Sequence, residues 1–299
     1  MNHKIVVIGS SNTDMTVRGR RLPVPGETVT GGTFYMGPGG KGANQAVAAR
    51  RLGGDVTFIC KVGRDLFGDN AIAGYEREGI DCSHVLRSHQ ATGVALILVD
   101  DKGENCISVA SGANADLTPA DIDSVAPVIR SASFLILQLE TPVEIVLRAA
   151  KLAHEAGVYV ILNPAPAREV PSELFSYISL MTPNQTETAF MSGLPVETEA
   201  DLARAVEALH SYGVRDFVVT LGAKGSLVFT GGKAVRVPAC QVEAVDATAA
   251  GDTFCGALCV ALSEGKDLVE AARFATKASA LTVQRPGAQD AIPYRNEIQ

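Results

Sequence analysis

The sequence predicts an α/β protein, a three-layer α/β/α sandwich with a mostly parallel central sheet and a small β-sheet lid. Three observations lead to this fold class. Short runs rich in β-branched residues recur between stretches with helical spacing. These runs are continuously apolar, the pattern of strands covered on both faces of a sheet. Two further segments interrupt the alternation of strand and helix, and they predict the lid.

The six apolar runs read, in chain order, KIVVIGS, VTFICKV, FLILQLE, VYVILN, ISLMTPN and DFVVTLG. Their lack of polar alternation predicts strands of a parallel sheet that is buried on both sides. Helices are expected between them, for example over residues 142–155 and 200–212. In such folds ligands bind beyond the carboxyl ends of the strands, so the functional site is expected at that edge.

The two interrupting segments cover about residues 15–36 and 91–110. Each looks like a pair of strands joined by a turn, with DDKGEN as one hairpin tip. A small sheet outside the main layer would expose an apolar face, which needs cover from the cleft or from another subunit. No repeat or linker divides the chain. We therefore expect residues 1–299 to form a single domain, with a lid that also makes a homodimer.

Composition narrows the class of protein. The 299 residues are 46% hydrophobic and 20% charged, which is ordinary for a folded protein with a large core. A net charge of −7 and a pI near 5.3 argue against a nucleic-acid partner and favour small substrates. No apolar segment is long enough for a signal peptide or a membrane span, which predicts a soluble cytoplasmic protein without membrane contact. The six cysteines lack metal or redox spacing, and we interpret them as reduced core residues.

The stretch VDATAAGDTFCGAL predicts an anion-binding corner. Ala249, Ala250 and Gly251 leave backbone N–H groups bare, and the following residues have helical spacing. Asp252 would lie beside the bound anion. The alternative interpretation is that Asp252 only caps the helix.

The stretch GPGGKGANQAVAARRLGG is a glycine-rich loop that leads into a helix. It contains G-x-G-x-x-G, but it does not follow the first strand as a dinucleotide fingerprint would. It is not a phosphate-binding Walker loop either, because Lys41 is followed by glycine. We interpret it as a cradle for a polyol or a phosphate, with a nicotinamide-dependent dehydrogenase as an alternative.

Three other stretches have a functional and a purely structural interpretation. Asn12 and Asp14 follow the first strand, where they could hold a hydroxyl-rich ligand or form an Asx turn. Asn184 and Glu187 could form a capping box, and the same carboxylate could order water around magnesium. The glycines of TLGAKGS could let a nucleotide approach the backbone, or belong to a simple hairpin.

Six segments in this order, GGKGANQA, QLETP, NPAPA, TPNQTE, TLGAKG and DATAAGDTF, resemble the ribokinase (PfkB) family of sugar kinases. The resemblance extends from Ile5 to about Pro293. It implies phosphorylation of the 5-hydroxyl of D-ribose by ATP, with 2-deoxyribose, another sugar or a nucleoside as alternative substrates. It also implies magnesium and potassium as cofactors. A sugar-binding protein without turnover is a rival, but it would have lost the acid or the anion corner.

The resemblance assigns roles to individual residues. Asp252 would remove the proton from the sugar hydroxyl, late in the transfer because such a hydroxyl is a very weak acid. The amides of Ala249, Ala250 and Gly251 would bind the developing negative charge. The implied ligands of the sugar are Asn12, Asp14, Gly40, Lys41, Gly42, Asn44 and Glu140, together with Asp252.

The resemblance also implies the nucleotide and cation sites. The nucleotide contacts would be Asn184, Thr220, Gly222, Gly225, Gly251 and Thr276. Glu187 would organise magnesium through water. Potassium would be held by Asp246, the Thr248 main chain and carbonyls of Thr282, Arg285 and Gly287. Ala247 stands where many relatives have threonine, and we expect the potassium site to persist because Asp246 and Thr248 are present. A hydroxyl-rich free sugar is favoured over a flat base, since only 5% of residues are aromatic.

Overall fold

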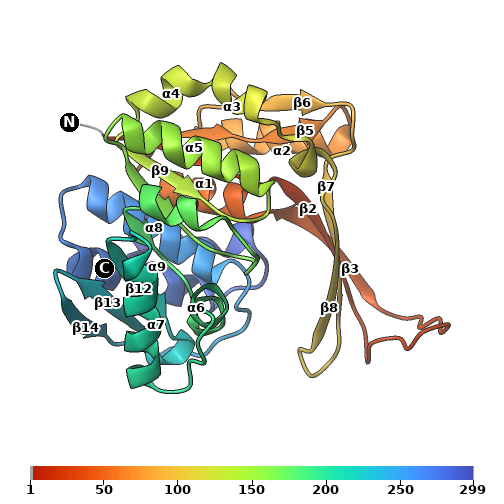
Figure 1. The fold of residues 1–299 in the computed structure, drawn as a ribbon. Helices are drawn as coiled ribbons and strands as arrows, with labels where there is room; N and C mark the ends of the chain where they lie inside the picture. Colours follow the sequence, from red (N-terminus) through yellow and green to blue (C-terminus); the bar gives the residue numbers. More distant parts are fainter. Residues whose placement is uncertain (1–2, 299) are drawn as a thin grey trace.

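The computed structural model describes residues 3–298, and its centre is an eight-stranded sheet in the order β14-β13-β12-β11-β10-β9-β1-β4 (Figure 1). All neighbouring pairs from β4 to β12 are parallel, and β13 alone runs antiparallel to both of its neighbours. The strands are β1 (Lys4–Ile8), β4 (Asp55–Ile59), β9 (Phe134–Leu137), β10 (Tyr159–Leu162), β11 (Leu180–Met181), β12 (Asp216–Thr220), β13 (Ser226–Thr230) and β14 (Lys233–Val237). Each apolar run of the sequence contributes one of the parallel strands, so the predicted sheet is confirmed.

Helices cover both faces of this sheet. Alternate residues of β1 belong to different hydrophobic clusters: Ile5 and Val7 pack with α1, α8 and α9, whereas Val6 and Ile8 pack with α4, α5 and α7. Figure 1 shows α5 and α8 on opposite sides of β9. The helices are α1 (Lys41–Arg51), α2 (Leu66–Arg77), α3 (Pro119–Ser124), α4 (Ala126–Ser131), α5 (Val143–Glu155), α6 (Gln185–Ser192), α7 (Glu199–Ser211), α8 (Ala250–Ser263) and α9 (Leu268–Thr282). Short 3₁₀ helices are η1 (Gly112–Asp116), η2 (Ser172–Tyr177), η3 (Gly222–Lys224), η4 (Gln289–Ala291) and η5 (Arg295–Glu297).

The predicted lid is a separate four-stranded mixed sheet, in the order β3-β2-β7-β8. Its strands are β2 (Asn12–Arg18), β3 (Thr33–Gly39), β7 (Gly93–Val99) and β8 (Asn105–Ala110). The DDKGEN hairpin closes with hydrogen bonds from Gly103 N to Asp100 O and from Asp100 N to Glu104 O. In Figure 1 both hairpins project away from the rest of the molecule. The first pair of lid strands begins earlier and ends later than the expected 15–36, because β2 pairs with β3 and β7 along its whole length, whereas the second pair lies within the expected 91–110.

The run VTFICKV divides between two sheets. Its first part is β4 in the central sheet, and its last part is β5 (Lys61–Gly63), which pairs in parallel with β6 (Leu86–Ser88). Continuous apolarity does not distinguish one strand from two short ones, since both are buried here.

Two glycines let α1 approach its neighbours closely. A Cβ on Gly42 would lie 2.6 Å from the carbonyl carbon of Gly9 and from the nitrogen of Ser10. A Cβ on Gly256 would lie 2.8 Å from the Cβ of Ala48. Only glycine fits at such distances. The first turn of α1 therefore lies directly against the end of β1, and α1 packs closely along α8.

Not all cysteines lie in the core, as the sequence suggested. Cys60, Cys255 and Cys259 are buried and Cys82 is partly buried, but Cys106 and Cys240 are exposed. The expectation is wrong for these two because every residue of β8, including Cys106, is exposed at the edge of the lid, and Cys240 lies in an exposed connection. Among residues 3–298, no helix has the length and apolarity needed to cross a bilayer.

Candidate active site

Asn12 and Asp14 lie on β2, where the lid joins the body of the protein. Both are part of a paired strand, so the Asx-turn alternative is wrong. Asn114 Nδ2 donates to Asn12 Oδ1 at 2.8 Å, which fixes the orientation of the Asn12 amide. The Asn12 NH₂ group has no partner among the described residues. It is available to donate to a ligand.

Glu140 is held at the start of α1. Its Oε2 accepts a 2.5 Å hydrogen bond from Ser10 Oγ and a 2.9 Å hydrogen bond from the backbone N of Lys41. The helix start is electropositive and favours a carboxylate at this place. Gly40 precedes the helix with φ 91°, a conformation that glycine adopts readily. The glycine-rich loop therefore brings Glu140 and Lys41 together, as expected.

Four carboxylates lie close enough to Lys41 to act on the charge of its ammonium group. The pKa of Lys41 is raised, chiefly by Asp252, against the opposing effect of burial and with further help from Glu140, Glu187 and Asp14. The pKa of Asp14 is raised to about 6, first by burial and then by the negative charges of Glu140 and Asp252. One cation thus faces four acids. A ligand that offers hydroxyl donors would relieve part of this repulsion.

Asp252 lies in the first turn of α8 and is 5% exposed. Its Oδ2 accepts from Asn44 Nδ2 at 3.0 Å, and its Oδ1 accepts from Gln45 Nε2 at 2.9 Å. The N-cap of α8 is Ala249, and no side chain caps this helix. The interpretation of Asp252 as a helix cap is therefore wrong. The carboxylate belongs to a buried polar cluster at the start of α1.

The corner before α8 has an unusual backbone. Ala249 has φ 58°, the left-handed conformation, which costs a residue with a Cβ about 1–2 kcal/mol. The Ala250 N–H donates to Ala247 O at 3.2 Å, so this amide takes part in the turn. The N–H groups of Ala249 and Gly251 have no partner among the described residues. Of the three amides predicted to bind an anion, Ala250 is thus already engaged, and anion binding by the other two stays a prediction.

Asn184 and Thr220 lie side by side through a parallel bridge between their backbones. Asn184 Oδ1 accepts from Glu187 N at 2.8 Å, and Glu187 Oε2 accepts from Asn184 N at 2.9 Å. This confirms the capping box at the start of α6. The other carboxylate oxygen of Glu187 is not used by the box, and burial raises the pKa of this residue. A carboxylate oxygen of this kind suits water-mediated contact with magnesium.

The turn between β12 and β13 confirms the hairpin interpretation of TLGAKGS. The two strands are antiparallel, and Leu221 N donates to Gly225 O at 2.7 Å. Gly222 and Gly225 both have positive φ, at 57° and 87°. Thr276 lies on α9, where its hydroxyl donates to Ala272 O at 2.8 Å. Its side chain is therefore engaged within the helix.

The residues predicted to hold potassium come from the loop before α8, the end of α9 and the loop after it, and Asp246 joins the two loops. Its Oδ1 accepts from the Thr248 N and Oγ1, and its Oδ2 accepts from Gly287 N at 3.0 Å. Burial acts to raise the pKa of Asp246, but the hydrogen bonds from Thr248 and Gly287 outweigh it and lower the pKa. Thr282 lies at the end of α9, and the Arg285 guanidinium pairs with Glu297.

Within residues 3–298, no group of three or more His, Cys, Asp or Glu side chains is placed to hold a metal ion. A cation at these loops would therefore be bound by main-chain carbonyls and the single carboxylate of Asp246. Such hard oxygen donors suit an alkali ion better than a transition metal.

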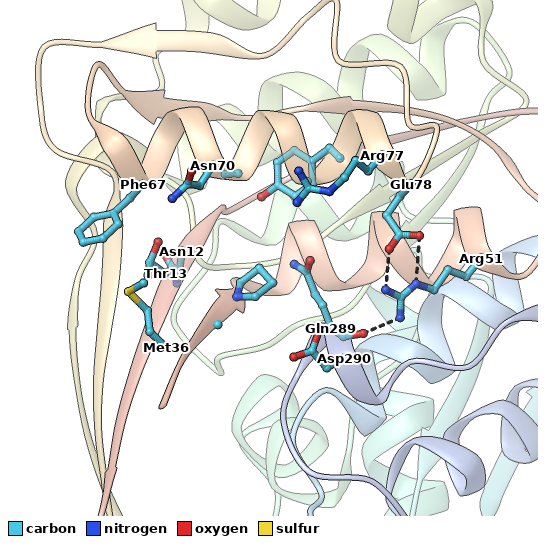
Figure 2. Close-up of a pocket in the computed structure, with 15 residues that line it drawn as sticks. Asn12, Thr13, Met36, Arg51, Phe67, Asn70, Arg77, Glu78, Gln289 and Asp290 are labelled. Atoms are coloured by element: carbon cyan, nitrogen blue, oxygen red, sulfur yellow. Dashed lines mark hydrogen bonds and ion pairs between the residues drawn. The ribbon is translucent and has the colours of Figure 1, made fainter. Parts of the chain in front are cut away.

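A cavity of about 280 Å³ lies between α2, the end of β3 and η4 (Figure 2). The Arg51–Glu78 ion pair, at 2.6 Å, closes one end, and Phe67 lies at the other. Of the predicted sugar ligands, only Asn12 lines it. The cavity therefore borders the polar cluster of Asp252 but does not contain it.

Several site residues were not predicted from the sequence. Ser10 holds Glu140, Asn114 orients Asn12, and Gln45 contacts Asp252. Ser10 lies just after the first strand, and Gln45 lies within the segment GGKGANQA as a polar residue on the buried face of a helix. The buried position of this polar side chain was the signal in the sequence that it has a partner. Asn114 follows the second lid hairpin, and its neighbours in the sequence give no comparable signal.

A family model described as pfkB family carbohydrate kinase matches residues 2–295. The chain belongs to this family. Among pfkB relatives, a ribokinase of Haemophilus influenzae is 42% identical over 298 residues, which cover 99% of this chain and 97% of that protein. A deoxyribokinase of Salmonella typhimurium is 38% identical and covers 97% and 95% of the two chains. The match makes the dehydrogenase alternative for GPGGKG wrong.

The structure of an Arabidopsis thaliana ribokinase complexed with ribose and ATP has a TM-score of 0.91 to this chain, with 35% identity. The alignment covers 100% of this chain and 98% of that one. The fold is thus the ribokinase-like α/β fold, with its separate lid. The protein is a carbohydrate kinase of the pfkB family.

Proposed function

We propose that the protein transfers the γ-phosphoryl group of ATP to the 5-hydroxyl of D-ribose. The observation that carries this proposal is the position of Asp252. It is a buried carboxylate in the first turn of α8, next to two open backbone amides and beside Lys41. A base beside an anion site can align a hydroxyl with a phosphoryl group.

The sugar would bind between the lid and the carboxyl end of β1. Asn12 offers free N–H donors, and Asp14 and Glu140 offer carboxylate acceptors. Lys41 offers an ammonium donor. Donors and acceptors on several sides suit a small molecule with a hydroxyl on each carbon.

In the transfer, the sugar oxygen forms a bond to the γ-phosphorus and the bond from that phosphorus to the leaving oxygen of ADP breaks. The hydroxyl proton passes to Asp252 as the new bond forms, because the hydroxyl becomes acidic only then. The N–H groups of Ala249 and Gly251 would stabilise the charge of the transferring group. Lys41 would add a positive charge beside it.

Two cations are part of the proposal. Glu187 would hold magnesium through water, and Asp246 with the carbonyls of Thr248, Thr282, Arg285 and Gly287 would hold potassium. Magnesium supplies charge neutralisation at the nucleotide phosphates. The role of Asp246 is to fix the loop before Ala249, and its bond to Gly287 N supports that role. Asn184, Thr220, Gly222, Gly225 and Thr276 would contact the nucleotide.

We also propose that residues 1–299 form one kinase domain and that the lid makes a homodimer. Strand register places Phe34, Met36 and Leu96 on the lid face opposite Asp14. Phe34 is 61% exposed and Leu96 is 53% exposed. An apolar sheet face that is this open is typical of an interface. A second copy of the lid is a suitable cover because it would present the same apolar strip.

Phosphorylation of 2-deoxyribose is the second candidate, supported by the 38% identity to a deoxyribokinase over nearly the whole chain. An assay of ADP release across ribose, 2-deoxyribose, hexoses and nucleosides tests the proposal. We expect the highest kcat/KM with ribose. A higher value with 2-deoxyribose would transfer the assignment to that sugar. Asp252→Asn should retain sugar and ATP binding while losing most of kcat.

A further inference from the structure

A chain of buried side-chain amides ends on Asp252. Gln45 Nε2 donates to Asp252 Oδ1 at 2.9 Å and to Asn163 Oδ1 at 3.1 Å. Gln45 Oε1 accepts from Gln138 Nε2 at 2.7 Å. Gln45 is 0% exposed, Asn163 is 7% exposed and Gln138 is 1% exposed. They connect α1 with the ends of β9 and β10 behind the carboxylate.

The orientation of each amide is fixed by its neighbours. Asn163 Nδ2 donates at 2.9 Å to the backbone carbonyl of Thr182, a group that can only accept. Asn163 Oδ1 must therefore face Gln45, and Gln45 must present its NH₂ group. Both N–H bonds of that group are used, one for Asn163 and one for Asp252. Gln45 Oε1 is left to face Gln138.

The chain is not arranged for stability alone. Gln138 Oε1 is buried and has no hydrogen-bond partner among the described residues. A buried acceptor without a partner is costly, and most folded proteins avoid it. A Cβ on Gly9 would lie 1.9 Å from this oxygen, so the glycine makes room for the unpaired atom. The unpaired oxygen is explained if Gln138 has to donate its NH₂ group to Gln45, because its oxygen then points the other way.

We propose that Gln45, held by Gln138, is a positioning residue for Asp252. This inference rests on the proposed role of Asp252 as the base. Asn44 Nδ2 binds Oδ2 and Gln45 Nε2 binds Oδ1, so the two amides together fix the plane of the carboxylate. Each oxygen keeps a lone pair that neither amide uses, and these are the acceptors left for the incoming hydroxyl.

Gln45 acts on the rate and not on sugar affinity. It is fully buried, so it does not touch a sugar that enters from solvent. Within residues 3–298, its one link to the proposed reacting atoms is the hydrogen bond to Asp252. A small error in the position of a reacting group lowers the rate by as much as about 100-fold without a comparable effect on binding.

Gln138→Met tests the inference. Methionine has a similar size, cannot donate to Gln45, and removes the unpaired Oε1. The variant loses the unpaired Oε1 of residue 138 but leaves Gln45 Oε1 without its donor. The number of unpaired buried acceptors is unchanged, so stability should stay near that of the wild type. We expect kcat to fall about 10- to 100-fold, with the sugar Kd by calorimetry unchanged within about threefold. Gln45→Met should act in the same direction.

Thr57→Val is the matched control. Thr57 is buried and donates to Asp81 away from the site, so this variant should lose stability and keep kcat. The inference is overturned if folded Gln138→Met keeps kcat within threefold of wild type, or if kcat and sugar affinity fall together. If Gln45→Met does not fold, the kcat of Gln138→Met alone tests the inference. Asp252→Asn distinguishes the two proposals. If Asp252→Asn is active, the role of Asp252 as the base is rejected. If Asp252→Asn is inactive and Gln138→Met has a normal kcat, only the positioning role of Gln45 is rejected.

Discussion

Asp14 should make the ligand-free protein less stable at neutral pH than it is in mild acid. Its carboxylate accepts no hydrogen bond from the described residues, and it is half-buried near Glu140 and Asp252. Burial and these two charges all disfavour the ionised form. Replacing Asp14 with asparagine removes the charge and keeps the shape, so the variant should be more stable than the wild type at neutral pH.

The magnitude follows from the pKa values. The folded protein holds the pKa of Asp14 at about 6, against an ordinary value of 3.8. The pKa of an acid is raised, so the native state binds the proton more tightly and loses stability as pH rises from 3.8 to about 6. At about 1.4 kcal/mol per pKa unit, the penalty is about 3 kcal/mol at pH 7.5 and about 1 kcal/mol at pH 4.5.

Urea unfolding of the wild type and of Asp14→Asn at pH 7.5 and pH 4.5 measures this difference. The stability gain of the variant should shrink by about 2 kcal/mol between the two pH values. Asp101→Asn, at the exposed tip of the lid hairpin, is the control and should show no such trend. An equal gain at both pH values would refute the reasoning, because it would mean that Asp14 carries no unfavourable charge.

Three other outcomes are expected. Ala249→Gly should have a free energy of unfolding within about 1 kcal/mol of the wild type, because relief of the left-handed backbone offsets the entropy that glycine loses on folding. A larger loss of stability in thermal unfolding would contradict this. Activity should be higher in potassium than in sodium, and Asp246→Asn should reduce that difference; equal wild-type rates in both salts would count against the loop site. Leu96→Glu should convert the dimer to a folded monomer in light scattering, and a wild type that is already monomeric would reject the lid interface.

The central sheet could be predicted from the sequence because its pattern has few alternatives. Strands covered on both faces are continuously apolar, and such strands are typical of parallel sheets. The lid was also predictable, since its segments interrupt the alternation of strand and helix. Single residues within a strand were less certain. The apolar character of cysteine did not reveal that Cys106 faces solvent, because an edge strand of a lid has no covering layer.

The candidate site divides in the same way. Asn44 could be named because it lies within a motif that resembles known kinases, and the structure places it on Asp252. The partner of Gln45 could not be named. Gln138 lies 93 residues away and reaches it only because α1 and β9 meet in the fold. A polar residue on a buried helix face signals that a partner exists, but one sequence does not identify that partner.

Two features of the ligand-free site are unfavourable for folding. Asp14 holds a charge near Glu140 and Asp252, and Gln138 holds an unpaired acceptor and is linked to Asp252 through Gln45. A core selected for stability alone would contain neither. Both become intelligible if the cluster is built for its substrates, since hydroxyl donors reduce the repulsion at Asp14 and a fixed carboxylate aligns the phosphoryl acceptor. The prediction is that sugar raises the melting temperature of the wild type more than that of Asp14→Asn, because only the wild type has this repulsion to relieve.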